Sequence, residues 1–364
     1  MSLHLLPPPD PDPGKCCSTA TLACRRLTSP ICTRPAFTGK LKSPDTTPPT
    51  VPVHEPDFLS SRTTCEKLRA TWLGHACYYV EYPSGLRVLF DPVFDDRCSP
   101  FTFLGPKRYT PTPCAIADIP VVDAVFISHS HYDHLSRNSV LDLQRHHPRA
   151  HFFVGRGLEG WFKKHGLRNV TELDWWEDAE INLTLGRAGD SGAPRDVTAR
   201  ISCTPSQHTS GRGIFDRDST LWCSWAVYSG GRSVWFAGDT GYRRVPRTPK
   251  FANNYGPEHE ALPRCPQFKQ IGELRGPFDL GLIPIGAYHP PAAFSRMHAN
   301  PFDAVEIFCD SRCRRAMAIH WGTWALTMEE VLEPPALLRE ALKRKGLPET
   351  GTFDVCDIGE SREF

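Results

Sequence analysis

A short stretch around residue 130 constrains this chain more than any other part of it. Residues Ala124–Ile127 are all apolar, which predicts a buried strand. The sequence then reads Ser-His-Ser-His-Tyr-Asp-His, so three histidines and one aspartate fall within residues 129–134. Imidazole and carboxylate groups are the usual ligands of catalytic zinc. The pattern predicts a metal site at the end of a strand, and a polar loop with surface histidines is the alternative.

The spacing inside this motif predicts two neighbouring centres. His129 and His131 share a face, because side chains two residues apart in an extended chain point the same way. Asp133 and His134 follow the turn and can reach a second centre beside the first.

Other candidate ligands follow predicted strands further along the chain. His208, Asp239 and His320 each lie just past the end of a strand. Strand ends that converge at one rim of a sheet sandwich would bring these side chains together. The predicted ligands are His129, His131 and His208 for one metal, Asp133, His134 and His320 for the second, and Asp239 between them. A carboxylate suits the bridging position because it has two oxygens and a charge that both cations can share.

The rest of the chain suggests one large domain with an appendage, or two fused halves. It has 364 residues, and residues 1–60 hold 12 of its 35 prolines. We expect residues 1–60 to be a disordered extension or a segment strapped across the surface, and residues 61–364 to form the main folded domain. A strand-rich first half passes into alternating strands and helices.

The predicted elements begin near Leu68. We expect strands at 70–73, 77–82, 87–90, 124–127, 151–154, 170–173, 197–203, 221–228, 233–237, 278–285 and 315–319. Helices are expected at 136–147, 157–165, 300–310 and 332–345. Asn300 can cap the third helix with Pro301 in its first turn, and Gly346 can end the fourth. Residues 94–120, 186–196 and 243–276 are expected to be turns or irregular.

Composition excludes some classes of protein and restricts the location. The net charge of +1 leaves no strong field for nucleic acid. The 14 cysteines are scattered without any Cys-x-x-Cys pair, which favours a reducing, intracellular and cytoplasmic location. No secretory signal is expected, and no apolar run approaches the roughly 20 residues that span a bilayer.

Several stretches resemble the metallo-β-lactamase superfamily and, within it, the N-acylphosphatidylethanolamine-hydrolysing phospholipase D family. The matching stretches are Trp72–His75, Asp91–Phe94, Gly105–Tyr109, Ser128–Leu135, Gln207–His208, Gly211–Gly213, Leu221–Trp222, Ser224–Ala226, Gly238–Gly241, Pro284–Tyr288 and His320–Thr323. The resemblance covers roughly residues 69–345. It weakens after Tyr288, where the family continues Glu-Pro-Arg-Trp-Phe-Met and this chain has His-Pro-Pro-Ala-Ala-Phe at 289–294.

The resemblance implies an α/β fold, the αββα sandwich of the superfamily, and a phosphodiesterase reaction. Two Zn²⁺ ions would share a hydroxide that attacks the phosphorus of N-acylphosphatidylethanolamine, so that N-acylethanolamine leaves and phosphatidic acid remains. Asp133 and Asp239 would be the catalytic carboxylates, with Asp239 also orienting the hydroxide. The implied partners are a phospholipid substrate, a peripheral membrane surface and a second copy of the chain in a homodimer.

Further polar residues are candidates for supporting roles. Asp91 and His75 could hold metal ligands in place, although a turn-capping aspartate and a core histidine are the alternatives. Tyr132, Arg212, Tyr288 and His298 are candidate substrate contacts, and for Arg212 a solvated loop position is the alternative. Residues 101–109, aromatic with two cations, could rest on a membrane interface or pack as a buried loop.

Rival functions use the same fold and metals. A lactonase, or another hydrolase of small esters or phosphodiesters, would want a small polar pocket. A nuclease would want a basic stripe that this sequence lacks. A structural metal scaffold would close its coordination with four ligands, often cysteines, whereas seven nitrogen and oxygen ligands for two ions leave room for water.

Overall fold

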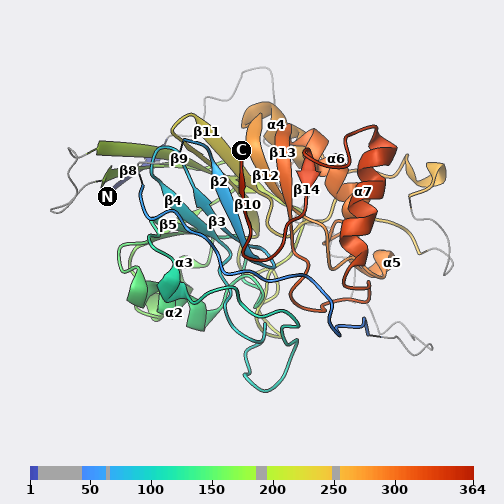
Figure 1. The fold of residues 1–364 in the computed structure, drawn as a ribbon, viewed down its shortest axis with the longest axis horizontal. Coiled ribbons are helices and arrows are strands. Elements are labelled where there is room, and N and C mark those ends of the chain that lie inside the picture. The colour runs from blue at the N-terminus through green and yellow to red at the C-terminus, as the bar shows by residue number, and fades with distance from the viewer. Residues whose placement is uncertain (7–42, 63–65, 186–194, 248–254) are drawn as a thin grey trace.

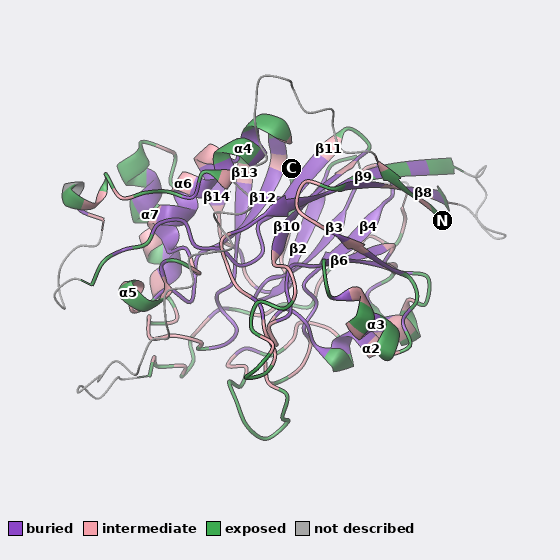
Figure 2. Ribbon diagram, turned by 180° about the vertical axis from the view of Figure 1, so that it is seen from behind, coloured by how far each residue is buried: buried purple, intermediate pink, exposed green. Residues whose placement is uncertain are grey.

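Two mixed β-sheets pack face to face with helices on both outer sides (Figure 1). The computed structural model describes residues 1–6, 43–62, 66–185, 195–247 and 255–364. In Figure 2 the central strands of both sheets are buried, while the outer surfaces of the helices and part of the strand labelled β8 are exposed. The α/β fold and the αββα sandwich expected from the sequence are therefore confirmed.

The first sheet has seven strands in the order β15-β2-β3-β4-β5-β6-β7. Their bounds are β2 Arg69–Gly74, β3 Cys77–Glu81, β4 Arg87–Phe90, β5 Ala124–Ile127, β6 His151–Gly155, β7 Val170–Leu173 and β15 Ser361–Glu363. The strands from β15 to β4 are antiparallel to their neighbours, and those from β4 to β7 run parallel.

The second sheet has eight strands in the order β1-β8-β9-β10-β11-β12-β13-β14. Their bounds are β1 Ser2–Leu6, β8 Asp178–Leu185, β9 Arg195–Pro205, β10 Cys223–Ser229, β11 Arg232–Phe236, β12 Phe278–Pro284, β13 Cys313–Ile319 and β14 Phe353–Asp354. From β11 to β14 the strands run parallel, so their carboxyl ends share one rim.

Strand β5 shows why its sequence is apolar on both faces. Ala124 and Phe126 point into the core between the sheets, and Val125 and Ile127 point into the core beneath the helices. Phe126 stacks on Phe90 with ring centroids 5.2 Å apart. A strand buried on both faces cannot alternate with polar residues, so it reads as a continuous apolar run.

The helices cover the outer faces. Helices α2 (Arg137–His146) and α3 (Glu159–Lys164) lie over the first sheet, whereas α4 (Gln267–Leu274), α6 (Pro301–Asp310) and α7 (Glu333–Lys345) lie over the second (Figure 1). The predicted cap is confirmed, because the side chain of Asn300 accepts a hydrogen bond from the Asp303 N–H at 2.9 Å. Gly346 ends α7 with φ of 73°, a left-handed conformation that glycine adopts without strain.

Several elements depart from the expectations, among them the short strands β14 and β15, which were not predicted. Residues 2–6 form β1 by pairing with β8, although they belong to the proline-rich extension; residues 7–42 lie outside the described part. Strand β8 itself was not predicted. Helix α4 lies in the region expected to be irregular, because the prolines there precede the helix and Phe268 and Ile271, one turn apart, are both buried.

Two expectations about the chain as a whole can be compared with the described residues. Within them, no helix is both long and apolar enough to cross a bilayer. The cysteines that the structure describes form no disulfide.

The close approach of β12 and β13 gives a test of the packing at the rim. A Cβ atom on Gly286 would lie 2.1 Å from the carbonyl oxygen of His320. We expect Gly286→Ala to lower the free energy of unfolding by about 1–3 kcal/mol, because backbone atoms must move. Urea denaturation measures this change.

The matched control is Gly160→Ala on the surface of α3, where nothing lies within 4 Å of the added Cβ. This change should raise the free energy of unfolding slightly, because alanine favours a helix by about 0.5–1 kcal/mol over glycine. Equal urea midpoints for the two variants would contradict the described approach of the strands.

Candidate metal centre

The ends of four strands bring the predicted ligands to one rim between the sheets. Strand β5 leads into the motif that begins at Ser128, and β9 leads to His208. Strands β11 and β13 end just before Asp239 and His320. All of these side chains are buried or nearly so, although each is polar.

Three histidines form the first group. His131 Nδ1 lies 2.8 Å from His129 Nε2 and 3.2 Å from His208 Nε2. The other ring nitrogens of His129 and His208 already have partners: Nδ1 of His129 lies 2.9 Å from the Ser128 hydroxyl, and Nδ1 of His208 donates to the Met297 carbonyl at 2.8 Å. The inward nitrogens therefore remain available as ligands.

A second group surrounds Asp133. Its Oδ2 lies 3.4 Å from His134 Nε2, 3.3 Å from His320 Nε2 and 3.1 Å from His75 Nε2. These four side chains can offer ligand atoms within 4.8 Å of one another. The predicted set of Asp133, His134 and His320 thus comes together, with His75 beside it.

Asp239 lies between the two groups. Its Oδ1 is 3.2 Å from His134 Nε2, and its Oδ2 is 3.0 Å from His320 Nε2. The same Oδ2 is 3.5 Å from His208 Nε2 in the first group. The carboxylate is therefore placed where a bridging ligand would sit.

The centre leaves buried polar atoms without hydrogen bonds. Among the described residues, His134 Nε2, His320 Nε2 and Asp239 Oδ1 have no hydrogen-bond partner. Buried polar atoms without partners are costly and call for an explanation such as an ion. Imidazole and carboxylate groups that converge in this way fit a divalent cation such as zinc.

The electrostatics of the groups agree with this fit. Burial, together with the neighbouring imidazoles, lowers the pKa of His129 well below its usual value, so this ring stays neutral and can donate a lone pair. Burial also lowers the pKa of His320, but the carboxylates of Asp239 and Asp133 outweigh that effect and raise it to about 9. The two carboxylates thus draw positive charge into the site.

Asp91 lies behind the ligands. Its Oδ2 is 2.6 Å from Nδ1 of His134, and its carboxylate accepts hydrogen bonds from the Ser128 N–H at 2.7 Å and the Ser128 hydroxyl at 2.5 Å. It therefore fixes both the ring of His134 and the start of the motif, as a carboxylate behind a metal-binding histidine does.

His75 supports Asp133 from the other side. Its backbone N–H donates to the Thr323 hydroxyl at 2.7 Å, and the centroid of its ring lies 4.2 Å from that of His320.

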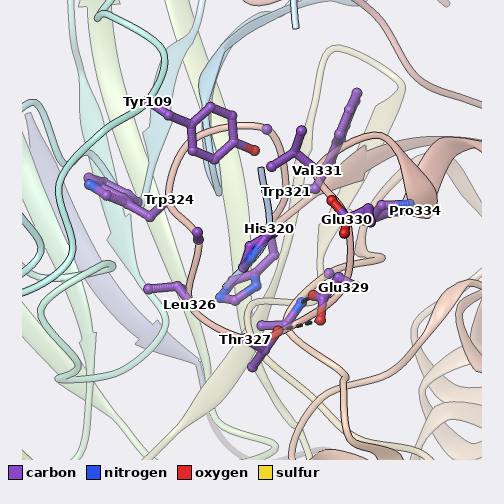
Figure 3. A pocket seen from close by; sticks show the side chains of 15 residues that line it. Tyr109, His320, Trp321, Trp324, Leu326, Thr327, Glu329, Glu330, Val331 and Pro334 are labelled. Carbon is purple, nitrogen blue, oxygen red and sulfur yellow. Dashed lines mark hydrogen bonds between the residues drawn. The ribbon is translucent and has the colours of Figure 1, made fainter. Parts of the chain in front are cut away.

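A hollow lies beside His320. Figure 3 shows this hollow, which is lined by Tyr109, Trp324 and Glu329 among others.

The candidate substrate contacts divide into two kinds. His298 points at the centre, with Nδ1 3.8 Å from Asp239 Oδ2 and no hydrogen-bond partner. Arg212 instead donates from Nη1 to the carbonyls of Ser130 at 2.8 Å and Leu135 at 2.6 Å, and its guanidinium lies 3.9 Å from the ring centre of Tyr132. These contacts of Arg212 hold the motif loop.

Tyr288 and two residues that the sequence did not single out complete the surroundings. The Tyr288 hydroxyl donates to Glu333 at 2.6 Å. Ser128 and Glu329 were not recognised as site residues, although the polar Ser128 directly before the first ligand was a usable signal. For Glu329 no local pattern exists, because the backbone amides that it accepts from lie about 40 residues away.

Comparison with known proteins agrees with the fold and the site. The model of the beta-lactamase superfamily domain matches residues 86–321. N-acyl-phosphatidylethanolamine-hydrolyzing phospholipase D 1 of Caenorhabditis elegans is 38% identical over 321 residues, which cover 85% of this chain and 80% of that protein. The mitochondrial N-acyl-phosphatidylethanolamine-hydrolyzing phospholipase D of Saccharomyces cerevisiae is 34% identical over 81% of this chain and 55% of its own length.

Solved structures share the fold at low identity. Igni18, a metallo hydrolase of Ignicoccus hospitalis, gives a TM-score of 0.51 at 19% identity and covers 82% of this chain and 98% of its own. A possible metal-dependent hydrolase of Veillonella parvula gives a TM-score of 0.52 at 14% identity, covering 82% of this chain and 100% of its own.

The match to the superfamily model and the identity to the Caenorhabditis elegans relative together identify the family. The chain is a hydrolase of the beta-lactamase superfamily and belongs to the family of the N-acyl-phosphatidylethanolamine-hydrolyzing phospholipases D.

Proposed function

We propose that this chain, with two zinc ions bound, hydrolyses N-acylphosphatidylethanolamine to N-acylethanolamine and phosphatidic acid. The observation that carries the proposal is the pair of adjoining ligand groups with Asp239 between them. The name of the Caenorhabditis elegans relative supports the choice of substrate. A two-metal site suits displacement at phosphorus, because it can stabilise both the attacking and the leaving oxygen.

The residues that would hold the two ions are those of the two groups. His129, His131 and His208 would bind one ion, Asp133, His134 and His320 the other, and Asp239 would contact both. Bound zinc supplies a water of lowered pKa and polarises the phosphoryl oxygen.

The chain's own residues contribute orientation and the handling of charge. Asp91 fixes the His134 ring, and the Met297 carbonyl fixes the His208 ring, so the lone pairs that face inward are set before any ion binds. In the reaction, water adds to phosphorus, and the bond from phosphorus to the ethanolamine oxygen breaks. The leaving alkoxide would take up a proton to become the N-acylethanolamine, and the position of His298 beside Asp239 supports a contact with it.

Two exposed apolar loop tips support contact with a lipid surface. Phe103 is 78% exposed and Phe215 is 100% exposed, and Leu104 and Ile214 beside them are exposed as well. One loop is held at helix α2, which follows the motif, because Asp95 accepts from the Ser139 hydroxyl at 3.0 Å. The other is held at the motif itself, because Arg212 donates to the Leu135 carbonyl. We propose that these tips enter a bilayer beside the metal centre. The homodimer and the cytoplasmic location remain predictions.

The reaction can be tested in water enriched in ¹⁸O with the zinc-loaded protein and N-acylphosphatidylethanolamine in mixed micelles. Cleavage at phosphorus places the label in phosphatidic acid and none in N-acylethanolamine, which mass spectrometry distinguishes. We expect His208→Ala to lower kcat/KM by at least about 100-fold, because one ligand is lost. A chelator should abolish turnover.

His146→Ala is the matched control, because His146 lies on the partly exposed surface of α2; it should keep full activity. If the wild-type protein with two zinc ions leaves this lipid intact but opens lactones or other esters, the proposed substrate is wrong.

The lipid surface can be tested by vesicle flotation. The double change Phe103→Ser and Phe215→Ser should lower binding to phosphatidylcholine vesicles at least about tenfold, since each buried aromatic side chain contributes roughly 1.5–3 kcal/mol. Turnover of short-chain substrate without vesicles should be unchanged. Leu274→Ser, an exposed leucine on α4, is the control. Equal binding by wild type, double variant and control would exclude these tips as the anchor.

A further inference from the structure

The segment 287–299 connects β12 to α6 and passes beside the metal centre. We name this segment the strap. Its far end is fastened to the turns that carry two candidate ligands. The Met297 carbonyl accepts from His208 Nδ1 at 2.8 Å, and the Arg296 carbonyl accepts from the Gln207 side chain at 2.9 Å. The Ala299 N–H donates to the Thr240 carbonyl at 2.6 Å.

The strap lies directly on the turn that contains Asp239. A Cβ atom on Gly241 would lie 2.3 Å from the carbonyl carbon of Arg296, so only glycine leaves room for the strap there. His298, within the strap, is thereby placed 3.8 Å from Asp239. The position of the strap therefore determines whether His298 faces the metal centre.

The near end of the strap is held by one carboxylate. Glu329 Oε1 accepts from the backbone N–H of Ala287 at 2.5 Å and from that of Tyr288 at 3.3 Å. Its Oε2 accepts from the N–H of His289 at 3.1 Å and from the Thr327 hydroxyl. Figure 3 shows Glu329 beside Thr327 in the hollow next to His320.

Three consecutive backbone amides donate hydrogen bonds to the single side chain of Glu329. Strand β12 ends at Pro284, and these amides lie beyond its ladder with β13. Backbone donors in a partly buried place need an acceptor, and a carboxylate gives hydrogen bonds that are stronger than those between neutral groups. Ala287 adopts a φ of 65°, which turns the backbone toward Glu329 and is rarely adopted by alanine.

We propose that Glu329 is a positioning residue that sets the strap, and through it His298 and the ring of His208, for the substrate. The part of this inference that concerns the substrate rests on the proposed function. Because the His289 N–H is one of its donors, Glu329 also fixes where residues 289–294 of the strap begin. Among the described residues, no hydrogen bond or ion pair joins Glu329 to a candidate ligand.

Hydrogen exchange measured by mass spectrometry tests the anchor directly, because the amides of 287–289 are themselves the donors. We expect Glu329→Gln, which keeps one carbonyl acceptor, to speed exchange of these amides about tenfold, and Glu329→Ala to speed it further. Exchange in β12 and α6 should stay as in the wild type. Metal content should be retained, and KM for N-acylphosphatidylethanolamine should rise about tenfold with kcat changed less than about threefold.

Glu330→Gln is the matched control. Its side chain accepts from the Asp45 N–H at 3.3 Å and makes no hydrogen bond to the amides of 287–289 in the described structure. This variant should match the wild type in exchange, KM and kcat.

Two results would overturn the inference. One is unchanged exchange of 287–289 in both Glu329 variants. The other is faster exchange throughout the chain with a lower melting temperature, which would make Glu329 a general structural residue. The exchange result does not depend on the substrate, so failure of the proposed reaction, seen as no turnover by the wild type, is distinguishable from failure of the anchor.

Discussion

The structure depends on a set of polar side chains that converge where water is nearly excluded. Asp133, Asp239 and five histidines lie within a few ångströms of one another at the rim of the sandwich. Burying such groups is unfavourable unless they are paired or bind a cation. Several of their inward atoms make no hydrogen bond. The arrangement is therefore held by the backbone, because the ends of four strands fix where these side chains lie.

The surrounding scaffold explains how the arrangement is kept in place. Asp91 and the Met297 carbonyl each fix one imidazole ring, and Gly286 and Gly241 let neighbouring backbone segments approach closely. We propose that the exposed loop tips at Phe103 and Phe215 and the strap act on the substrate side. In this proposal the metal ligands determine the reaction, and the loops that follow β12 and β13 determine which substrate reaches the centre.

The convergence of the candidate ligands could be predicted because its signals are local, whereas their binding of metal stays a prediction. The motif at 129–134 has a dense spacing, and His208, Asp239 and His320 each follow a recognisable strand. The start of helix α6 was predicted correctly, because Asn300 caps the helix and Pro301 lies in its first turn. Strand β1 and helix α4 were missed because their pairing and packing partners are distant in sequence. For Glu329 and for the carbonyl partners of Arg212, only the three-dimensional structure supplies the contacts.

The most direct test of the account is the number of metal ions that the folded chain holds. Native mass spectrometry, with elemental analysis of the same sample, should find two zinc ions per chain in the wild-type protein. It should find a loss of bound metal in Asp239→Asn, whose side chain would contact both ions. A folded wild-type chain that binds one ion or none under zinc-replete conditions would contradict the central claim.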